Sequence, residues 1–170
     1  MSRAETDAQF RDFVAARSAA LMRLAYLLAP DPAAADDLLQ TALLRTYQRW
    51  RQVAEPEAYV RRVLVTVAVD ERRRPYRRES AFEAVPDVPV ADDALGRVHD
   101  AELLRSALAG LPARQRAAVV LRYREGLSAA QVAGLLGCSE GTARSQAVRG
   151  LGKLRAAWGD ETATVEGGRR

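Results

Sequence analysis

The chain has 170 residues, a hydrophobic fraction of 48% and a formal net charge of +4, which fits a globular protein with a polyanionic partner. The single cysteine, Cys138, and the single histidine, His99, exclude an internal disulfide and the clustered ligands of zinc or haem sites. The N-terminus has no apolar signal core and no run approaches the roughly 18 apolar residues of a spanning helix, so we expect a cytoplasmic protein without membrane contact, metal or cofactor.

The first two predicted helices are separated by a proline signal. Thr6 begins the first helix as a capping residue, and Pro30 stops it. Asp31 before Pro32 is a helix start, and the second helix runs to about Trp50. Its apolar residues cover more of the circumference than one core face requires. Two interpretations fit: docking to another protein, or burial on both sides inside one bundle.

A third helix begins at Pro56 and ends before Pro75. The residues expected to pack inward are Tyr59, Val63 and Val67, with Val60 and Leu64 as further candidates. Seven arginines lie within residues 61–78, close to Trp50 and Tyr59. This strip favours phosphate contact and base stacking over an ordinary solvated face.

The following segment is acidic and contains Pro86 and Pro89, which is typical of a flexible linker. Helical periodicity resumes at about Asp92, and Pro112 begins another helix. No strand pattern persists, so the fold class is all-α: two small helical bundles joined by a flexible linker. The expected limits are a first domain at 1–76, a linker at 77–98, a second domain at 99–158 and an irregular polar tail at 159–170. The sequence leaves open whether the two bundles pack together.

Residues 128–158 predict two helices joined by a short turn. Ser128 and Gln131 fit a capping box, Gly137 suits the left-handed residue that closes a helix, and Ser139 can cap the next one. The inward stripe of that second helix is Ala143, Ala147, Leu151, Leu154 and Trp158; the outward residues of its first turns are Thr142, Arg144, Ser145, Gln146 and Arg149. Polar side chains at the start of such a helix favour a helix-turn-helix that enters the DNA major groove over an ordinary helical hairpin.

Three segments in this order resemble the bacterial RNA polymerase sigma factors. Residues 111–155, LPARQRAAVVLRYREGLSAAQVAGLLGCSEGTARSQAVRGLGKLR, resemble region 4. Residues 34–50, AADDLLQTALLRTYQRW, resemble the polymerase-docking part of region 2, and residues 58–74, AYVRRVLVTVAVDERRR, resemble its promoter-melting helix. With these two regions alone on a short linker, the chain is similar to the extracytoplasmic-function (group IV) sigma factors over residues 7–158.

The resemblance implies three surfaces. Docking to the β′ clamp helices of the polymerase falls on Asp36, Asp37, Leu38, Gln40, Thr41, Leu44 and Tyr47, which favours the docking interpretation of the second helix. Gripping and opening the −10 element falls on Arg61, Arg62, Thr66, Arg72 and Arg73, together with the loop 51–56. Reading the −35 element falls on Arg144, Ser145, Gln146, Val148 and Arg149. The family commonly has asparagine where Thr66 stands, which leaves the base preference at that position open.

An alternative sigma factor is the function that the resemblance implies. It would bind core RNA polymerase through the β′ clamp helices and the β flap, direct it to specific promoters and promote −10 melting, with no catalysis and no small-molecule substrate. An anti-sigma factor is a further expected partner. The alternatives are a stand-alone helix-turn-helix regulator that dimerises through its first bundle, and an adaptor that binds only proteins.

Overall fold

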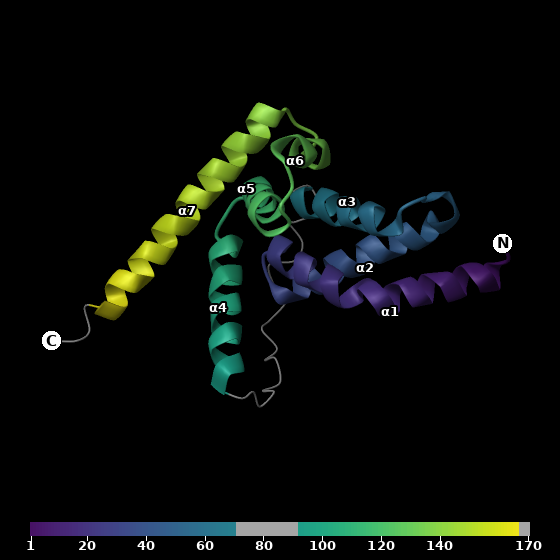
Figure 1. The fold of residues 1–170 in the computed structure, drawn as a ribbon, viewed down its shortest axis with the longest axis horizontal. Helices are drawn as coiled ribbons and strands as arrows, with labels where there is room; N and C mark the ends of the chain where they lie inside the picture. The colour runs from purple at the N-terminus through teal and green to yellow at the C-terminus, as the bar shows by residue number, and fades with distance from the viewer. Residues whose placement is uncertain (71–91, 167–170) are drawn as a thin grey trace.

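The computed structural model describes the backbone of residues 1–70 and 92–166, and the side chains of residues 1–70 and 100–158. Every regular element in this part of the chain is helical (Figure 1), as the all-α prediction required. The elements are α1 (Arg3–Leu28), α2 (Pro32–Gln48), η1 (Trp50–Gln52), α3 (Pro56–Val69), α4 (Asp92–Ala109), α5 (Ala113–Val119), η3 (Val120–Arg124), α6 (Ala129–Leu136) and α7 (Glu140–Glu166). We call α1–α3 the N-terminal bundle and α4–α7 the C-terminal bundle.

Local capping determines where the helices of the N-terminal bundle begin. α1 starts one turn earlier than predicted, because Ser2 and Glu5 form the capping box: the Glu5 N–H donates to Ser2 Oγ at 3.2 Å and the Ser2 N–H to Glu5 Oε2 at 2.6 Å. Thr6, the predicted cap, is instead a buried residue within the helix. The Asp31 cap of α2 is confirmed, since its Oδ1 accepts from the Ala34 N–H at 2.7 Å.

In the C-terminal bundle the predicted turn signals are confirmed. Ser128 and Gln131 form a capping box at the start of α6, and Gly137 ends that helix with a φ of 64°. The Thr142 N–H donates to Ser139 Oγ at 3.1 Å at the start of α7. The end of α7 differs from the prediction, because the helix continues to Glu166 through most of the expected polar tail. Trp158, expected on the buried stripe, is 39% exposed.

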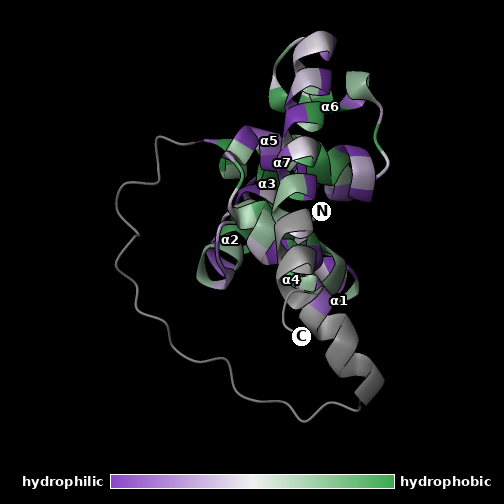
Figure 2. Ribbon diagram, turned by 90° about the vertical axis from the view of Figure 1, so that its left-hand side faces the viewer, coloured by the Kyte–Doolittle hydropathy of each residue, from purple (hydrophilic) through white to green (hydrophobic). Residues whose placement is uncertain are grey.

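The two bundles pack against each other. α3 contacts both α5 and α6, and α1 contacts α4 and α5, so the buried hydrophobic residues form one cluster that extends across both bundles. Figure 2 shows hydrophobic residues gathered on the inner sides of the helices around α3. The predicted linker lies outside the described residues from 77 to 91, and residues 92–98 belong to α4.

Val65 shows how much α3 depends on this packing. Val60, Val63 and Leu64 are buried, as predicted, whereas Val65 lies about 160° around the helix from Val63. One bundle covers only one side of a helix, yet the exposed fraction of Val65 is 0%. The C-terminal bundle, through α5 and α6, therefore provides its cover.

Arg116 of α5 is a buried cation between the bundles, with an exposed fraction of 2%. Its guanidinium donates to the backbone carbonyl oxygens of Leu28 at 3.0 Å, Leu108 at 2.9 Å, Ala109 at 3.2 Å and Leu111 at 2.9 Å. Leu28 ends α1 and Ala109 ends α4, so the charge lies at the negative ends of two helix dipoles. Arg116 thereby connects the N-terminal and C-terminal bundles.

A second polar contact between the bundles joins α1 to α4. Tyr26 Oη donates to Glu102 Oε2 at 3.5 Å, and Arg105 pairs with Glu102 at 2.6 Å while its guanidinium lies 5.6 Å from the Tyr26 ring centre. Arg105 also donates to the carbonyl oxygen of Pro30 at 3.4 Å. Hydrogen bonding from Arg105 lowers the pKa of Glu102, whereas burial and then the Glu102 charge raise the pKa of Tyr26. The carboxylate, the phenol and the guanidinium therefore remain in their ordinary charge states near neutral pH.

The close crossing of α5 and α7 requires a residue without a side chain. A Cβ atom at Gly150 would lie 2.6 Å from Val119 Cγ2 and 3.1 Å from the Gln115 carbonyl oxygen, whereas a Cβ atom at Gly152 would meet nothing within 4 Å. We expect Gly150→Ala to destabilise the protein by about 1–2 kcal/mol, because overpacking outweighs the roughly 1 kcal/mol gain in helix propensity. Gly152→Ala should show that gain alone. Thermal unfolding gives the change in Tm for each variant. Equal changes in Tm for Gly150→Ala and Gly152→Ala would contradict the close crossing of α5 and α7.

Candidate nucleic-acid and polymerase interfaces

The start of α7 presents an exposed polar face. Arg144, Ser145, Val148 and Arg149 lie on one side of the helix and are all exposed, with Val148 at 65%. We call these four residues the reading face. Ala143, Ala147, Gly150 and Leu154 are buried on the opposite side and fix the helix against α5 and α6. The reading face is therefore held rigidly and open to a duplex.

Gln146 is the one predicted −35 residue that the structure does not bring onto this face. It lies at the edge of the buried side of α7 and is half-buried. Arg144 pairs with Glu140 at 2.6 Å, but both side chains are well exposed, at 65% and 49%. Exposed pairs of this kind contribute about 0–1 kcal/mol, so a phosphate or a guanine can replace Glu140 at little cost.

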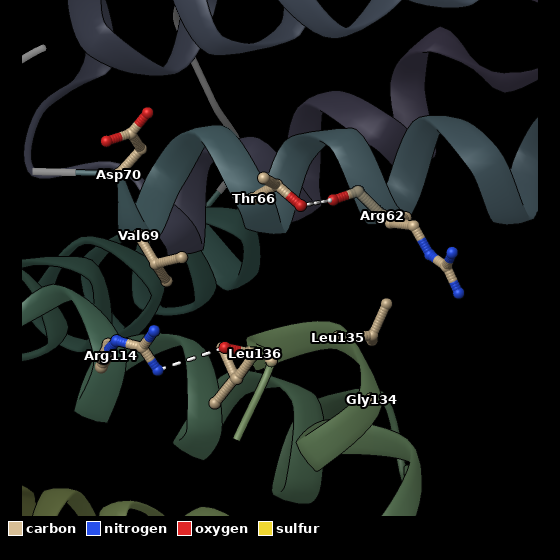
Figure 3. A pocket seen from close by; sticks show the side chains of 9 residues that line it. Arg62, Thr66, Val69, Asp70, Arg114, Gly134, Leu135 and Leu136 are labelled. Atoms are coloured by element: carbon tan, nitrogen blue, oxygen red, sulfur yellow. Dashed lines mark hydrogen bonds between the residues drawn. The ribbon is translucent and has the colours of Figure 1, made fainter. Parts of the chain in front are cut away.

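The predicted −10 residues that the structure describes lie together on α3. We call Arg61, Arg62 and Thr66 the basic face of α3. Arg62 and Thr66 line a cleft opposite the end of α6 (Figure 3), and Arg61 reaches Glu125 of the C-terminal bundle. Thr66 Oγ1 donates to the carbonyl oxygen of Arg62 at 2.8 Å. That contact uses its only hydrogen and leaves the hydroxyl oxygen as an acceptor. Arg72 and Arg73 lie outside the described residues.

Arg61 belongs to a chain of charges that crosses between the bundles. It pairs with Glu57 on α3 at 3.3 Å and with Glu125, which follows η3, at 2.5 Å. Glu57 also pairs with Arg17 of α1 at 3.1 Å. Glu125 is the more enclosed of the two carboxylates, with an exposed side-chain fraction of 18% against 37% for Glu57. No local pattern signals the pair of Arg61 and Glu125, since its members are 64 residues apart.

The outer face of α2 carries six of the seven residues predicted to dock to the polymerase. Asp36, Gln40 and Leu44 are exposed, and Asp37, Thr41 and Tyr47 are half-buried beside them. Leu44 is 58% exposed, so burial on both sides of α2 is excluded at that position. Leu38 departs from the prediction: it is 6% exposed and packs in the core on the other side of α2.

A shallow groove of about 450 Å³ lies along this face, between α1 and α2. We call it the docking groove; its lining is Asp7, Phe10, Arg11, Leu43, Leu44 and Tyr47. Tyr47 Oη donates to Asp7 Oδ1 at 2.6 Å, and this hydrogen bond raises the pKa of Tyr47. The Phe10 ring lies 5.1 Å from that of Tyr47 and 5.2 Å from that of Trp50, in edge contacts. The sequence does not predict that Asp7, Phe10 and Arg11 of α1 line this groove, because helical periodicity does not show which helix packs beside α2.

The described residues contain no group of three or more histidine, cysteine, aspartate or glutamate side chains placed to hold a metal ion. Among the same residues, no helix combines the length and the apolar character that crossing a bilayer would need. What the structure does present is an exposed helix-turn-helix face on one bundle, with a basic helix and an apolar groove on the other. Fold and surface together define an all-helical protein of the helix-turn-helix, DNA-binding class.

The comparisons with known proteins agree with this class. Residues 13–78 match the family model described as Sigma-70 region 2, and residues 101–154 match the one described as Sigma-70, region 4. The chain is 41% identical over 150 residues to the RNA polymerase sigma-E factor of Streptomyces avermitilis, covering 86% of this chain and 83% of that protein. It is 34% identical over 137 residues to the ECF RNA polymerase sigma factor SigM of Mycobacterium tuberculosis, covering 79% and 69%.

A solved structure with a similar fold is the sigma factor RpoE from Bartonella quintana, which was crystallised in complex with the anti-sigma factor NepR. The TM-score is 0.67 at 23% identity, covering 88% of this chain and 96% of that one. The chain belongs to the extracytoplasmic-function group of RNA polymerase sigma factors. The N-terminal bundle matches Sigma-70 region 2. Neither a stand-alone helix-turn-helix regulator nor an adaptor accounts for that match.

Proposed function

We propose that this sigma factor binds core RNA polymerase through the docking groove and the outer face of α2, and positions it on promoters through α3 and α7. The observation that carries the proposal is the presence, on opposite bundles of one chain, of an exposed apolar groove and an exposed reading face. Sigma factors are transcription initiation factors, and we assign this chain no catalytic role of its own. It acts where the polymerase acts, in the cytoplasm.

The two DNA contacts differ in kind. The reading face of α7 suits the major groove of duplex DNA, where Arg144 and Arg149 can each pair with a guanine and Val148 can contact a thymine methyl group. The basic face of α3 suits a separated strand, because Arg61 and Arg62 can contact phosphates while Thr66 lies beside a base. Unstacking a base costs a few kcal/mol, which stacking at about 1–3 kcal/mol per base can offset.

An anti-sigma factor is a further partner that we propose for this chain. The RpoE protein of similar fold was crystallised with one, and the docking groove with the exposed Leu44 is an apolar surface that such an inhibitor could cover.

The direct test mixes the purified chain with sigma-free core polymerase and a library of promoter fragments, and sequences the 5′ ends of the transcripts. We expect defined start sites that share one −35 and one −10 sequence. Binding to DNA without any start of RNA synthesis would instead indicate a stand-alone regulator, and binding to polymerase without DNA dependence would indicate an adaptor.

Arg149→Ala tests the reading face within that assay. The guanidinium is exposed and able to reach a base edge, and loss of one bidentate base contact costs about 1–3 kcal/mol. We therefore expect transcription from the selected promoters to fall by about tenfold or more, with unchanged affinity for core polymerase. A variant that instead lost polymerase binding would show that α7 has been assigned to the wrong partner.

A further inference from the structure

A carboxylate borders the reading face at its first turn. Glu140 is the first residue of α7 and lies one helical turn before Arg144. The start of α7 lies beside α6 at the outer edge of the molecule (Figure 1), and the Glu140 side chain is 49% exposed there. Glu140 is the only acidic residue between positions 140 and 158. A single negative charge therefore lies beside the exposed cations of the reading face.

The fold of α7 does not depend on this carboxylate. Ser139 caps the helix, since its Oγ accepts from the Thr142 N–H at 3.1 Å and donates to Thr142 Oγ1 at 2.9 Å. The buried side of α7 is formed by Ala143, Ala147 and Leu154. An exposed acid in the first turn gains little from the helix dipole or from an exposed ion pair. Folding stability therefore gives only a weak reason for an acid at this position.

The ion pair with Arg144 leaves both side chains able to contact a base. Glu140 Oε1 accepts from Arg144 Nη2 at 2.6 Å. A guanidinium has further N–H donors on both terminal nitrogens, and a carboxylate has further acceptor sites on both oxygens. Arg144 can therefore keep this contact while it donates to a guanine, and Glu140 can accept a second hydrogen bond beside it.

The chemistry of the major groove determines which base suits this carboxylate. Cytosine presents the N4 amino group, a donor, and a glutamate can accept from it. Adenine also presents a donor, but its N7 acceptor lies next to it and would repel a carboxylate. Guanine and thymine present acceptors at the corresponding positions, and the phosphates are negatively charged. Cytosine is therefore the base against which Glu140 is stabilising.

We propose that Glu140 is a specificity-determining residue of the −35 contact, which accepts a hydrogen bond from the N4 amino group of a cytosine next to the base pair that Arg144 contacts. The inference rests on the function proposed for the reading face, and it adds an acid to a set of residues predicted to be basic, polar or apolar. Glu140 also acts against other sequences, because a carboxylate that faces an acceptor or a phosphate lowers affinity.

The experiment compares base preferences of the holoenzyme formed by the full chain and core polymerase. The −35 element of a selected promoter is randomised, and the transcribed templates are sequenced. Glu140→Ala removes the carboxylate, Glu140→Gln replaces it with an amide of the same length, and Arg144→Ala identifies the position that Arg144 reads. Asp100→Asn, at an exposed carboxylate on α4, is the matched control for loss of a negative charge.

We expect wild type and Asp100→Asn to prefer cytosine at one −35 position by about five- to tenfold. Glu140→Ala should lose that preference. Glu140→Gln should prefer adenine at the same position, because an amide can pair with both N6 and N7 of adenine. Arg144→Ala should keep the cytosine and lose the preference at the neighbouring position.

The affinity of the free chain for an unrelated duplex separates this role from a structural one. Both Glu140 variants should bind that duplex about twofold or more tightly than wild type, because a charge that repels phosphates is removed. A carboxylate needed only to hold α7 in shape would give the opposite result, weaker binding to every duplex. Circular dichroism verifies that the helices are intact.

Two results would overturn the proposal. One is a cytosine preference that both Glu140 variants retain. The other is a change confined to the position that Arg144→Ala also alters, since Glu140 would then only orient Arg144. Failure of the proposed function looks different, because the wild-type holoenzyme would itself show no preference at any −35 position.

Discussion

Arg116→Met is expected to lower the free energy of unfolding by about 3–5 kcal/mol, a large fraction of the stability of a small domain. The guanidinium is 2% exposed and bonds four backbone carbonyl oxygens. Methionine fills a similar volume but donates nothing. A buried ion pair can be replaced without loss when both partners become apolar, but backbone carbonyls cannot be replaced, so their desolvation remains uncompensated.

Arg114→Met is the matched control for this prediction. Arg114 lies two positions away, its side chain is exposed, and it donates to a single carbonyl oxygen, that of Leu136. Its replacement should cost less than about 1 kcal/mol. Urea unfolding followed by circular dichroism measures the free energy of unfolding of both methionine variants. The loss for Arg116→Lys should fall between the two, because an ammonium group cannot make the several directed hydrogen bonds of a guanidinium. Equal midpoints for the two methionine variants would show that the carbonyl contacts contribute little.

Local signals in the sequence predict the helix boundaries well. The Asp31 cap, the Ser128 capping box and the left-handed Gly137 are decided by residues within four positions of each other, and all three are present. Thr6 fails as a cap because a competing box at Ser2 and Glu5 lies one turn upstream and the longer helix buries Thr6. Capping rules identify possible starts, and packing selects among them.

The packing of the bundles cannot be predicted from periodicity. A single-faced apolar stripe predicts Val63 and Val67 but not Val65, whose burial depends on helices that follow the linker. The sequence places Arg116 in a motif but does not show its role between the bundles, because the Leu28 carbonyl oxygen to which it donates lies 88 residues away. The contacts that join the two bundles are therefore visible only in the structure.

The docking residues show where a motif and a helix face disagree. Leu38 belongs to the predicted docking surface because it lies within the matching segment, but two residues along a helix are a rotation of about 200°. Leu38 therefore lies about 160° around α2 from both Asp36 and Gln40, on the buried side with Leu39. A residue-by-residue test against the helical face would have removed it from the set.

Leu44→Asp is expected to weaken binding to core polymerase by about 100-fold or more. Leu44 is 58% exposed in the free chain and borders the docking groove, so it has apolar surface left to bury on a partner. Burying a leucine contributes about 1.5–3 kcal/mol, and an aspartate in its place must also be desolvated against an apolar surface. A loss of about 3 kcal/mol corresponds to about 100-fold in affinity. Because the side chain is exposed, the free energy of unfolding should hardly change.

Val148→Asp supplies the reciprocal control. Val148 is another strongly exposed aliphatic residue, at 65%, but it lies on the reading face of α7. A carboxylate there would repel the DNA backbone and lose the contact with a thymine methyl group, so duplex binding should fall while polymerase affinity stays within about twofold. Titration of fluorescent chain with core polymerase, and separately with duplex promoter DNA, gives all four affinities. If Leu44→Asp binds polymerase as wild type does, the docking groove is not the polymerase-binding surface; if both variants lose both partners, the two surfaces are not independent.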